Sequence, residues 1–188
     1  MIDANQRWNL PGARRAVAAL SGFDLHWVEE PLPSDDVEGY VRLRDSVDVP
    51  IAQGENVYTA YQFRDLLVRG ACDVIQPNLV RVGGITPFLR IAELAATFDI
   101  PVAPHLLFEL SGQLACCLPL PSMVEDVEDA SFAALGLLTR PSPVVVDAGL
   151  VSPRGSVGLG VHFGLDGFEE LDPIDQAPLD HRPARPVV

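Results

Sequence analysis

The chain has 188 residues, of which 48% are hydrophobic and 21% are charged, and this composition is typical of an ordered globular domain. Asp and Glu total 26 against 13 Lys and Arg, so the formal net charge is −13. An acidic surface disfavours nucleic acid and anionic membranes as partners, and we expect neither.

The start of the chain has no basic stretch followed by an apolar run, so no secretory signal is predicted. No apolar stretch reaches the roughly 18 residues that a membrane-spanning helix needs. We therefore expect a cytoplasmic protein.

Short apolar runs alternate with longer segments of helical periodicity along the chain. The runs predicted to be strands are Met1–Ala4, Leu25–Glu29, Val49–Gln53, Asp73–Gln76, Ile100–Pro104 and Met123–Val127.

Helices are predicted between most of these runs. Pro11 is suited to open one helix, and Thr86 followed by Pro87 is a strong start for another. Between them, Thr59 is predicted to cap a helix that ends at Gly70.

Strands that alternate with helices favour parallel βαβ units, in a barrel or in a doubly wound sheet. Acids and a histidine at the strand ends favour the barrel, because chemistry in (β/α) barrels collects at the C-terminal ends of the strands. We predict an α/β fold over residues 1–171, an incomplete TIM-type (β/α) barrel. Residues 172–188 are rich in proline, and we predict that they form a poorly ordered tail.

Three acids stand at the ends of the first three predicted strands. Asp3 ends the first and Glu29 the second, while Glu55 follows the third, and successive acids are 26 residues apart. Equal spacing predicts that they lie at the same height on adjacent strands. Converging carboxylates repel each other unless a cation lies between them, and all-oxygen ligation suits Mg²⁺, with Mn²⁺ as the alternative.

Other polar residues accompany this triad. Asn5 shares a face with Asp3 if the strand persists. Glu30 is adjacent to Glu29, so it must point elsewhere, to the pocket wall or to a basic neighbour. Together with Asn56, these are the candidate substrate-binding residues.

Two candidate proton-transfer residues follow later strands. His105 comes directly after the fifth predicted strand, and beside a metal-bound carboxylate substrate it is a natural general base. Glu125 stands at the end of the sixth, where it could donate or accept a proton on the far side.

In this order, six short strings resemble the C-terminal barrel of the mandelate racemase and muconate lactonizing enzyme family, within the enolase superfamily. They are Asp3-Ala4-Asn5-Gln6, Trp27-Val28-Glu29-Glu30-Pro31, Gly54-Glu55-Asn56, Gln76-Pro77-Asn78 with Gly83-Gly84, Pro104-His105 and Val124-Glu125. The resemblance covers about residues 1–165 and implies that the predicted strands are strands 3 to 8 of the family barrel.

The resemblance also implies roles for these residues. The triad would bind magnesium, His105 would remove a proton α to a carboxylate, and Glu125 would hydrogen-bond the carboxylate as it becomes an enediolate. Among histidine-type members, dehydration of sugar acids is the commonest activity and mandelate-type racemization a rarer one. We expect a small-molecule carboxylate as substrate, and a homo-oligomer in the full-length form.

Asn78 departs from the pattern, because histidine-type members usually place an aspartate there to pair with the histidine. Asparagine is neutral and can at best orient the ring by a hydrogen bond. Our hypothesis is that His105 is a weaker base here, or that the reaction differs from the family norm. Asn78 is therefore a third catalytic candidate.

The second departure is at the start, which corresponds to the third strand of the family barrel. In relatives, an earlier strand carries a Lys-x-Lys pair that contacts the substrate carboxylate, and this chain contains no lysine. We expect Met1 to be an internal methionine of a longer protein. The competing interpretations are a magnesium-dependent hydro-lyase, a racemase or epimerase, and an inactive fragment that lacks the capping domain and the Lys-x-Lys strand.

Overall fold

A computed structural model describes residues 1–155, 157–164 and 166 of the chain. A parallel sheet in the order β1-β2-β3-β4 lies at its centre. Its strands are β1 (Ile2–Asp3), β2 (Val28–Glu29), β3 (Ile51–Gln53) and β4 (Val74–Ile75).

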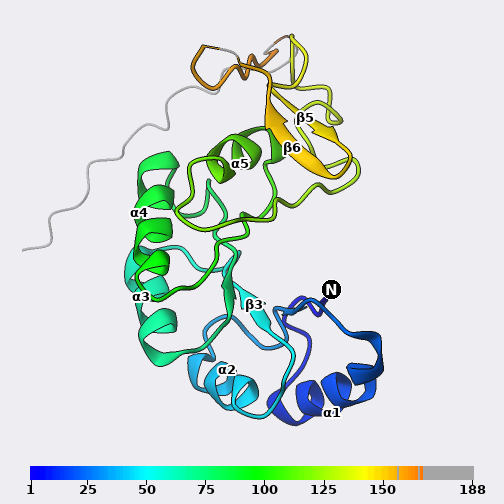
Figure 1. Cartoon of the computed structure of the whole chain (residues 1–188), viewed down its shortest axis with the longest axis vertical. Helices are drawn as coiled ribbons and strands as arrows, with labels where there is room; N and C mark the ends of the chain where they lie inside the picture. Colours follow the sequence, from blue (N-terminus) through cyan, green and yellow to red (C-terminus); the bar gives the residue numbers. More distant parts are fainter. Residues whose placement is uncertain (156, 165, 167–188) are drawn as a thin grey trace, which may run out of the picture.

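One helix follows each strand, as the predicted βαβ units require. These helices are α1 (Leu10–Leu20), α2 (Val37–Arg44), α3 (Ala60–Arg69) and α4 (Ile85–Ala96), with a 3₁₀ turn η1 (Ser21–Phe23) after α1. They form an arc along one side of the sheet (Figure 1). The α/β fold and the incomplete barrel are therefore confirmed.

The helix boundaries follow from local capping. At α3, the Thr59 side chain accepts from the Gln62 backbone and Gln62 reaches back, while Gly70 ends the helix in the left-handed conformation. At α1, the Asn9 side chain accepts from the backbone of Gly12, and Pro11 lies in the first turn. Both predicted starts are thus explained by side chains next to them in the sequence.

Alternate strand residues face opposite sides of the sheet. Val28, Ile51 and Ile75 belong to the large core that the sheet shares with the helices. Trp27 and Ala52 belong to a separate small cluster. This second cluster lies on the inner face, on the side away from the helices.

The fifth predicted strand runs parallel to β4 without forming a continuous ladder. Its only pairings within the described part of the chain are the bridges Ile75↔Val102 and Asn78↔His105. Pro101 in this segment and Pro77 after β4 have no N–H to donate across the pair, so the ladder is interrupted.

The prediction of a strand at Met123–Val127 is wrong, because this described segment has no regular secondary structure. The Ser122 hydroxyl donates to the Val102 carbonyl. This contact occupies the acceptor to which a backbone N–H of a neighbouring strand would donate. Glu125 therefore reaches the site from an irregular segment. The sheet contains fewer barrel strands than the sequence suggested.

A hairpin that the sequence analysis did not predict follows instead. Strands β5 (Val144–Asp147) and β6 (Leu150–Pro153) pair in antiparallel fashion around Ala148 and Gly149, which both have positive φ. The hairpin packs on α5 (Phe108–Ala115), as Figure 1 shows.

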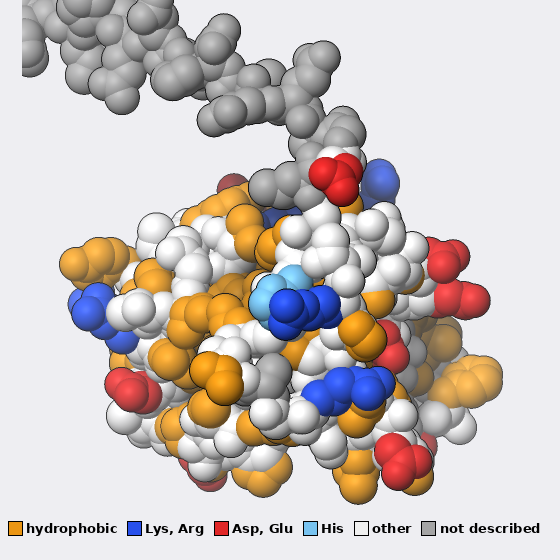
Figure 2. Space-filling view, turned by 90° about the horizontal axis from the view of Figure 1, so that it is seen from above, with side chains coloured by type: hydrophobic (Ala, Val, Ile, Leu, Met, Phe, Trp, Pro, Cys, Tyr) orange, Lys and Arg blue, Asp and Glu red, His pale blue; other side chains and the backbone are white. Residues whose placement is uncertain are grey.

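Within the described ranges, no helix combines the length and the apolar character that crossing a membrane would take. Figure 2 shows acidic, basic and apolar side chains interspersed on the face seen from above, so the excess of acids forms no continuous patch there. The predicted tail at 172–188 lies outside the described residues.

Candidate functional site

The predicted metal ligands stand at the C-terminal ends of β1, β2 and β3, but not all at one height. Asp3 pairs in register with Glu29, as expected. The register partner of Glu29 on β3 is Ala52, so Glu55 lies three residues further on, in the turn after the strand. The equal spacing in sequence therefore describes the first pair and misplaces Glu55.

Glu29 is the most enclosed of the three, with 3% of the residue exposed. The Trp27 indole donates to its carboxylate across 3.0 Å. Burial raises the pKa of Glu29, and the negative charges of Asp3 and Glu125 raise it further, while hydrogen bonds from Gln76 and Trp27 oppose the shift. A cation at this carboxylate would relieve both the desolvation and the repulsion.

Asp3 is exposed, and its carboxylate is turned back on its own loop. The Asn5 backbone N–H donates to Asp3 Oδ1 across 2.8 Å, and the Asn5 amide donates to Oδ2. Asn5 lies in the left-handed region, with φ of 45°. The candidate substrate ligand Asn5 is thus a partner of the candidate metal ligand in this conformation.

Glu30 points away from Glu29, as predicted, but its partners are amides and not a basic side chain. Its carboxylate accepts from Gln6 Nε2 across 2.8 Å and from Asn56 Nδ2 across 2.9 Å. Burial raises the pKa of Glu30, and the charge of Glu55 adds to the shift. The contacts link the loops after β1, β2 and β3.

Glu55 is held by a different group at each carboxylate oxygen. Oε2 lies 3.0 Å from His105 Nε2, and Oε1 lies 3.2 Å from Arg81 Nη1. The hydrogen bond to His105 holds the pKa of Glu55 below its ordinary value, against the effect of burial. For His105, burial lowers the pKa, but the hydrogen bond and charge of Glu55 outweigh it and the net shift is upward.

Asn78 determines which nitrogen of the neutral His105 ring carries the proton. Its Oδ1 accepts from the backbone N–H groups of Val80 and Arg81, at 3.0 and 3.1 Å, so its amide nitrogen must face the ring. Asn78 Nδ2 lies 2.9 Å from His105 Nδ1. Because Nδ2 only donates, Nδ1 must accept, and the ring proton lies on Nε2, facing Glu55.

Glu125 approaches the same histidine from the irregular segment. Its Oε2 lies 4.0 Å from His105 Nε2 and accepts from the Leu106 N–H across 2.7 Å. Leu106 and Leu107 have φ of 51° and 53°, a left-handed conformation that leucine rarely adopts. The buried Ser111 hydroxyl donates to the Leu106 carbonyl, so Glu125 and Ser111 together fix the strained loop behind His105.

The donor set fits a hard divalent cation by its chemistry, since Asp3, Glu29 and Glu55 supply only carboxylate oxygens. The raised pKa of Glu29, which burial causes first and the charges of Asp3 and Glu125 increase, supports the same conclusion. In the described part of the chain, however, no three acidic, histidine or cysteine side chains stand close enough together to hold a metal ion. For Asp3 and Glu55 to share one cation, the Asp3 carboxylate would have to turn from Asn5, and Oε2 of Glu55 from His105.

Sequence reasoning missed Arg81, which provides the guanidinium in this cluster. Its Nη1 contacts the Glu55 carbonyl at 2.8 Å, the Glu55 carboxylate at 3.2 Å and Asn56 Oδ1 at 3.1 Å. The sequence does contain a signal for this role, because Arg81 is the only basic residue between Arg69 and Arg90 and lies in the loop that follows Asn78.

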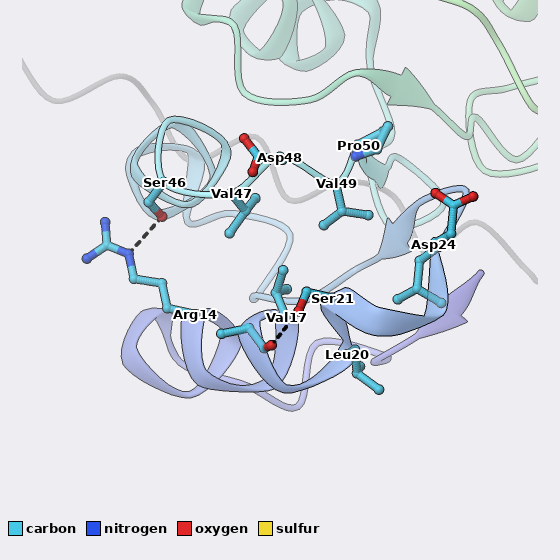
Figure 3. A pocket seen from close by; sticks show the side chains of 12 residues that line it. Arg14, Val17, Leu20, Ser21, Asp24, Ser46, Val47, Asp48, Val49 and Pro50 are labelled. Atoms are coloured by element: carbon cyan, nitrogen blue, oxygen red, sulfur yellow. Dashed lines mark hydrogen bonds between the residues drawn. The ribbon is translucent and has the colours of Figure 1, made fainter.

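Two hollows in the surface differ in their relation to these residues. One, of about 550 Å³, lies between α1 and the segment 46–50 (Figure 3), where Val49 and Pro50 precede β3. It is thus at the opposite ends of the strands from the carboxylates. Another, of about 660 Å³, is bordered by Gln6 and Asn56 and opens on the side of the site.

Parallel βαβ units with carboxylates and a histidine at the C-terminal strand ends define a (β/α)-barrel enzyme domain. The family model described as enolase C-terminal domain-like matches residues 1–166. The chain therefore belongs to the enolase C-terminal domain-like family.

Similar proteins include acid-sugar enzymes. L-talarate/galactarate dehydratase of Salmonella typhimurium is 40% identical over 128 residues, which cover 68% of this chain and 32% of that protein. A 3,6-anhydro-alpha-L-galactonate cycloisomerase of Streptomyces coelicolor is 33% identical, over 91% of this chain and 46% of the relative. The chain thus spans a third to a half of the length of these relatives.

Solved structures agree with the sequence matches. An L-talarate dehydratase from a Polaromonas species, complexed with Mg and L-glucarate, superimposes with a TM-score of 0.74 at 37% identity. The match covers 87% of this chain and 44% of that one.

Proposed function

We propose that the protein takes part in the magnesium-dependent dehydration of a sugar acid, and that Asp3, Glu29, Glu55 and His105 are the residues that carry the reaction. The observation that supports this most directly is the contact between His105 Nε2 and the Glu55 carboxylate, at 3.0 Å. It brings the proton-transfer candidate against a metal-ligand candidate, at the strand ends where barrel enzymes place their chemistry. The similarity to dehydratases of sugar acids supports the reaction class.

In the proposed reaction, the substrate loses the proton α to its carboxylate and the hydroxyl on the β carbon, and the resulting enol becomes a keto acid. His105 would accept the α-proton at Nε2 and then give it to the leaving hydroxyl, which departs as water. Because Asn78 places the ring proton on Nε2, the ring must first shift that proton to Nδ1 before Nε2 can act as a base.

Asp3, Glu29 and Glu55 would hold the magnesium ion, with Mn²⁺ as a possible substitute. When bound, the ion supplies positive charge that stabilises the second negative charge developing on the substrate carboxylate. In its protonated form, Glu125 would donate a hydrogen bond to the same oxygens, while its other oxygen can keep accepting from the N–H of Leu106. The amides of Asn5 and Asn56 and the carboxylate of Glu30 would orient the hydroxyl groups of the sugar acid.

A substrate screen tests this proposal. The purified chain is incubated with Mg²⁺ and with galactarate, L-talarate or D-galactonate, and the keto product is measured by its reaction with semicarbazide. We expect product with at least one acid, and a loss of at least about 100-fold in rate for His105→Ala, the low end for a general acid–base residue. Exchange of the α-proton in deuterated water is followed in parallel. If neither product nor magnesium-dependent exchange occurs with any of the acids, the proposal is wrong.

A further inference from the structure

The side chain of Arg81 closes a ring of hydrogen bonds around the proposed metal ligand Glu55. Asn78 Oδ1 accepts from the Arg81 backbone N–H, and Asn78 Nδ2 contacts His105. His105 in turn contacts Oε2 of Glu55, while Arg81 contacts Oε1. One residue, Asn78, thereby fixes both groups that hold the two oxygens of the carboxylate.

We propose that Arg81 is a positioning residue for the metal site, which holds Oε1 of Glu55 so that Oε2 is presented to the cation. This inference rests on the proposed function, because it takes Glu55 as a magnesium ligand.

The contacts of Arg81 suit this role better than a general neutralisation of charge. Its Nη1 reaches the Glu55 carbonyl, the Glu55 carboxylate and the Asn56 side chain, so it fixes the backbone and the side chain of the ligand together. Asn56 Nδ2 also donates to Glu55 Oε1 across 3.1 Å. Oε1 therefore has two partners on the side away from His105, whereas Oε2 has His105.

The location of Glu55 explains why such a device is needed. Asp3 and Glu29 follow the sheet register, but Glu55 lies three residues beyond the register partner of Glu29, in a turn. A turn residue has no ladder to fix its direction. The side chain is largely enclosed, with 13% exposed, so its hydrogen bonds are only weakly screened by water.

Arg81 could either strengthen or weaken the binding of Mg²⁺, and these two possibilities make the inference testable. A guanidinium that positions Glu55 strengthens magnesium binding, so its removal weakens binding. A guanidinium that acts only through its charge repels the cation, so its removal strengthens binding.

The experiment measures the dissociation constant of Mg²⁺ by titration calorimetry for the unaltered chain and for Arg81→Lys and Arg81→Met. Lysine keeps the charge but lacks the planar fork, so we expect Arg81→Lys to weaken Mg²⁺ binding and Arg81→Met to weaken it by about tenfold or more. Arg90→Met is the matched control, because Arg90 is exposed on α4 and its side chain makes no hydrogen bond or ion pair with other described residues. It should leave the constant unchanged.

Each outcome decides the matter. If Mg²⁺ binds the unaltered chain and both Arg81 variants equally, or binds Arg81→Met more tightly, the inference is overturned while the proposed function stands. If the unaltered chain binds no Mg²⁺ in the millimolar range, the proposed function fails together with the inference. Circular dichroism of each variant identifies any that has lost its fold, and for such a variant Arg81→Gln takes the place of Arg81→Met.

Discussion

Replacing Asn78 with aspartate should increase the ability of His105 to act as a base. In the protein, the Asn78 amide donates to His105 Nδ1, which leaves the ring proton on Nε2. An aspartate can keep one oxygen on the N–H groups of Val80 and Arg81 and turn the other to Nδ1, where it accepts a proton from the ring. The lone pair then lies on Nε2, which faces the proposed metal ligand and the substrate.

The size of the effect follows from the hydrogen bonds that hold the amide. To accept a proton from Nδ1, Asn78 must rotate its amide and give up two hydrogen bonds to the backbone, at 3.0 and 3.1 Å. Each such bond contributes about 1 kcal/mol, and leaving N–H groups unpaired adds to the cost, so the penalty is about 2 to 3 kcal/mol. The base-competent tautomer is then disfavoured by roughly 30- to 150-fold, and Asn78→Asp should raise turnover by up to that factor.

The assay compares the rate of solvent-deuterium exchange at the α carbon, and of product formation, for the unaltered chain, Asn78→Asp and Asn78→Ala. Alanine removes the amide that disfavours the Nδ1–H tautomer but offers no acceptor to that proton, so it should raise turnover less than aspartate does. Nitrogen-15 NMR of the histidine ring provides a measurement that is independent of activity, with the proton expected on Nε2 in the unaltered protein. A proton found on Nδ1 there, or unchanged turnover in Asn78→Asp, would refute the reasoning.

Three further predictions concern stability, each measured by urea denaturation. Gly54→Ala should destabilise the fold by about 3 kcal/mol, because the φ of Gly54 is +140° and the new Cβ would lie 2.7 Å from a backbone nitrogen. Gly22→Ala is the control and should change stability little, because a Cβ there would meet no atom within 4 Å. Tyr40→Phe should cost about 1 to 2 kcal/mol, because it leaves a buried carbonyl without its donor at 2.7 Å, and no loss would contradict that role. Without metal, the pair of His105 and Glu55 should stabilise the protein most between pH 4.5 and 6.5, the ordinary pKa values of glutamate and histidine. Stability should fall as the pH rises through the raised pKa of His105. It should also fall as the pH drops through the lowered pKa of Glu55. Glu55→Gln should flatten this profile.

Helices could be predicted from the sequence because their signals are local. Thr59 and Gly70 bound α3 by contacts within a few residues, and no distant part of the chain is needed to form them. The hairpin of β5 and β6 has only a weak local signal, because Ala148 stands at a positive-φ turn position where asparagine, aspartate or glycine is usual.

Strands depend on partners, and there the sequence was a weaker guide. The apolar run at Met123–Val127 resembles a strand, yet the Ser122 hydroxyl occupies the Val102 carbonyl beside it. The alternation of apolar and polar residues indicates only that a segment is suited to a sheet. Whether a neighbour offers free N–H and carbonyl groups is decided by the tertiary structure.

In the site, too, some features follow from local sequence and others from tertiary structure, and Glu55 shows both. Sequence spacing predicts that Glu55 is a metal ligand, but the directions of its two oxygens arise from the loops after β3 and β4 and from His105. Because Oε1 accepts from Arg81 and Asn56, Oε2 is the oxygen that we propose for a cation, and it now accepts from His105 Nε2. A cation at Oε2 would therefore compete with His105 Nε2 for the lone pairs of that oxygen. A bound cation would in this way release Nε2 of His105 from Glu55 and make it available to a substrate, so that metal binding and proton transfer would be coupled through one carboxylate.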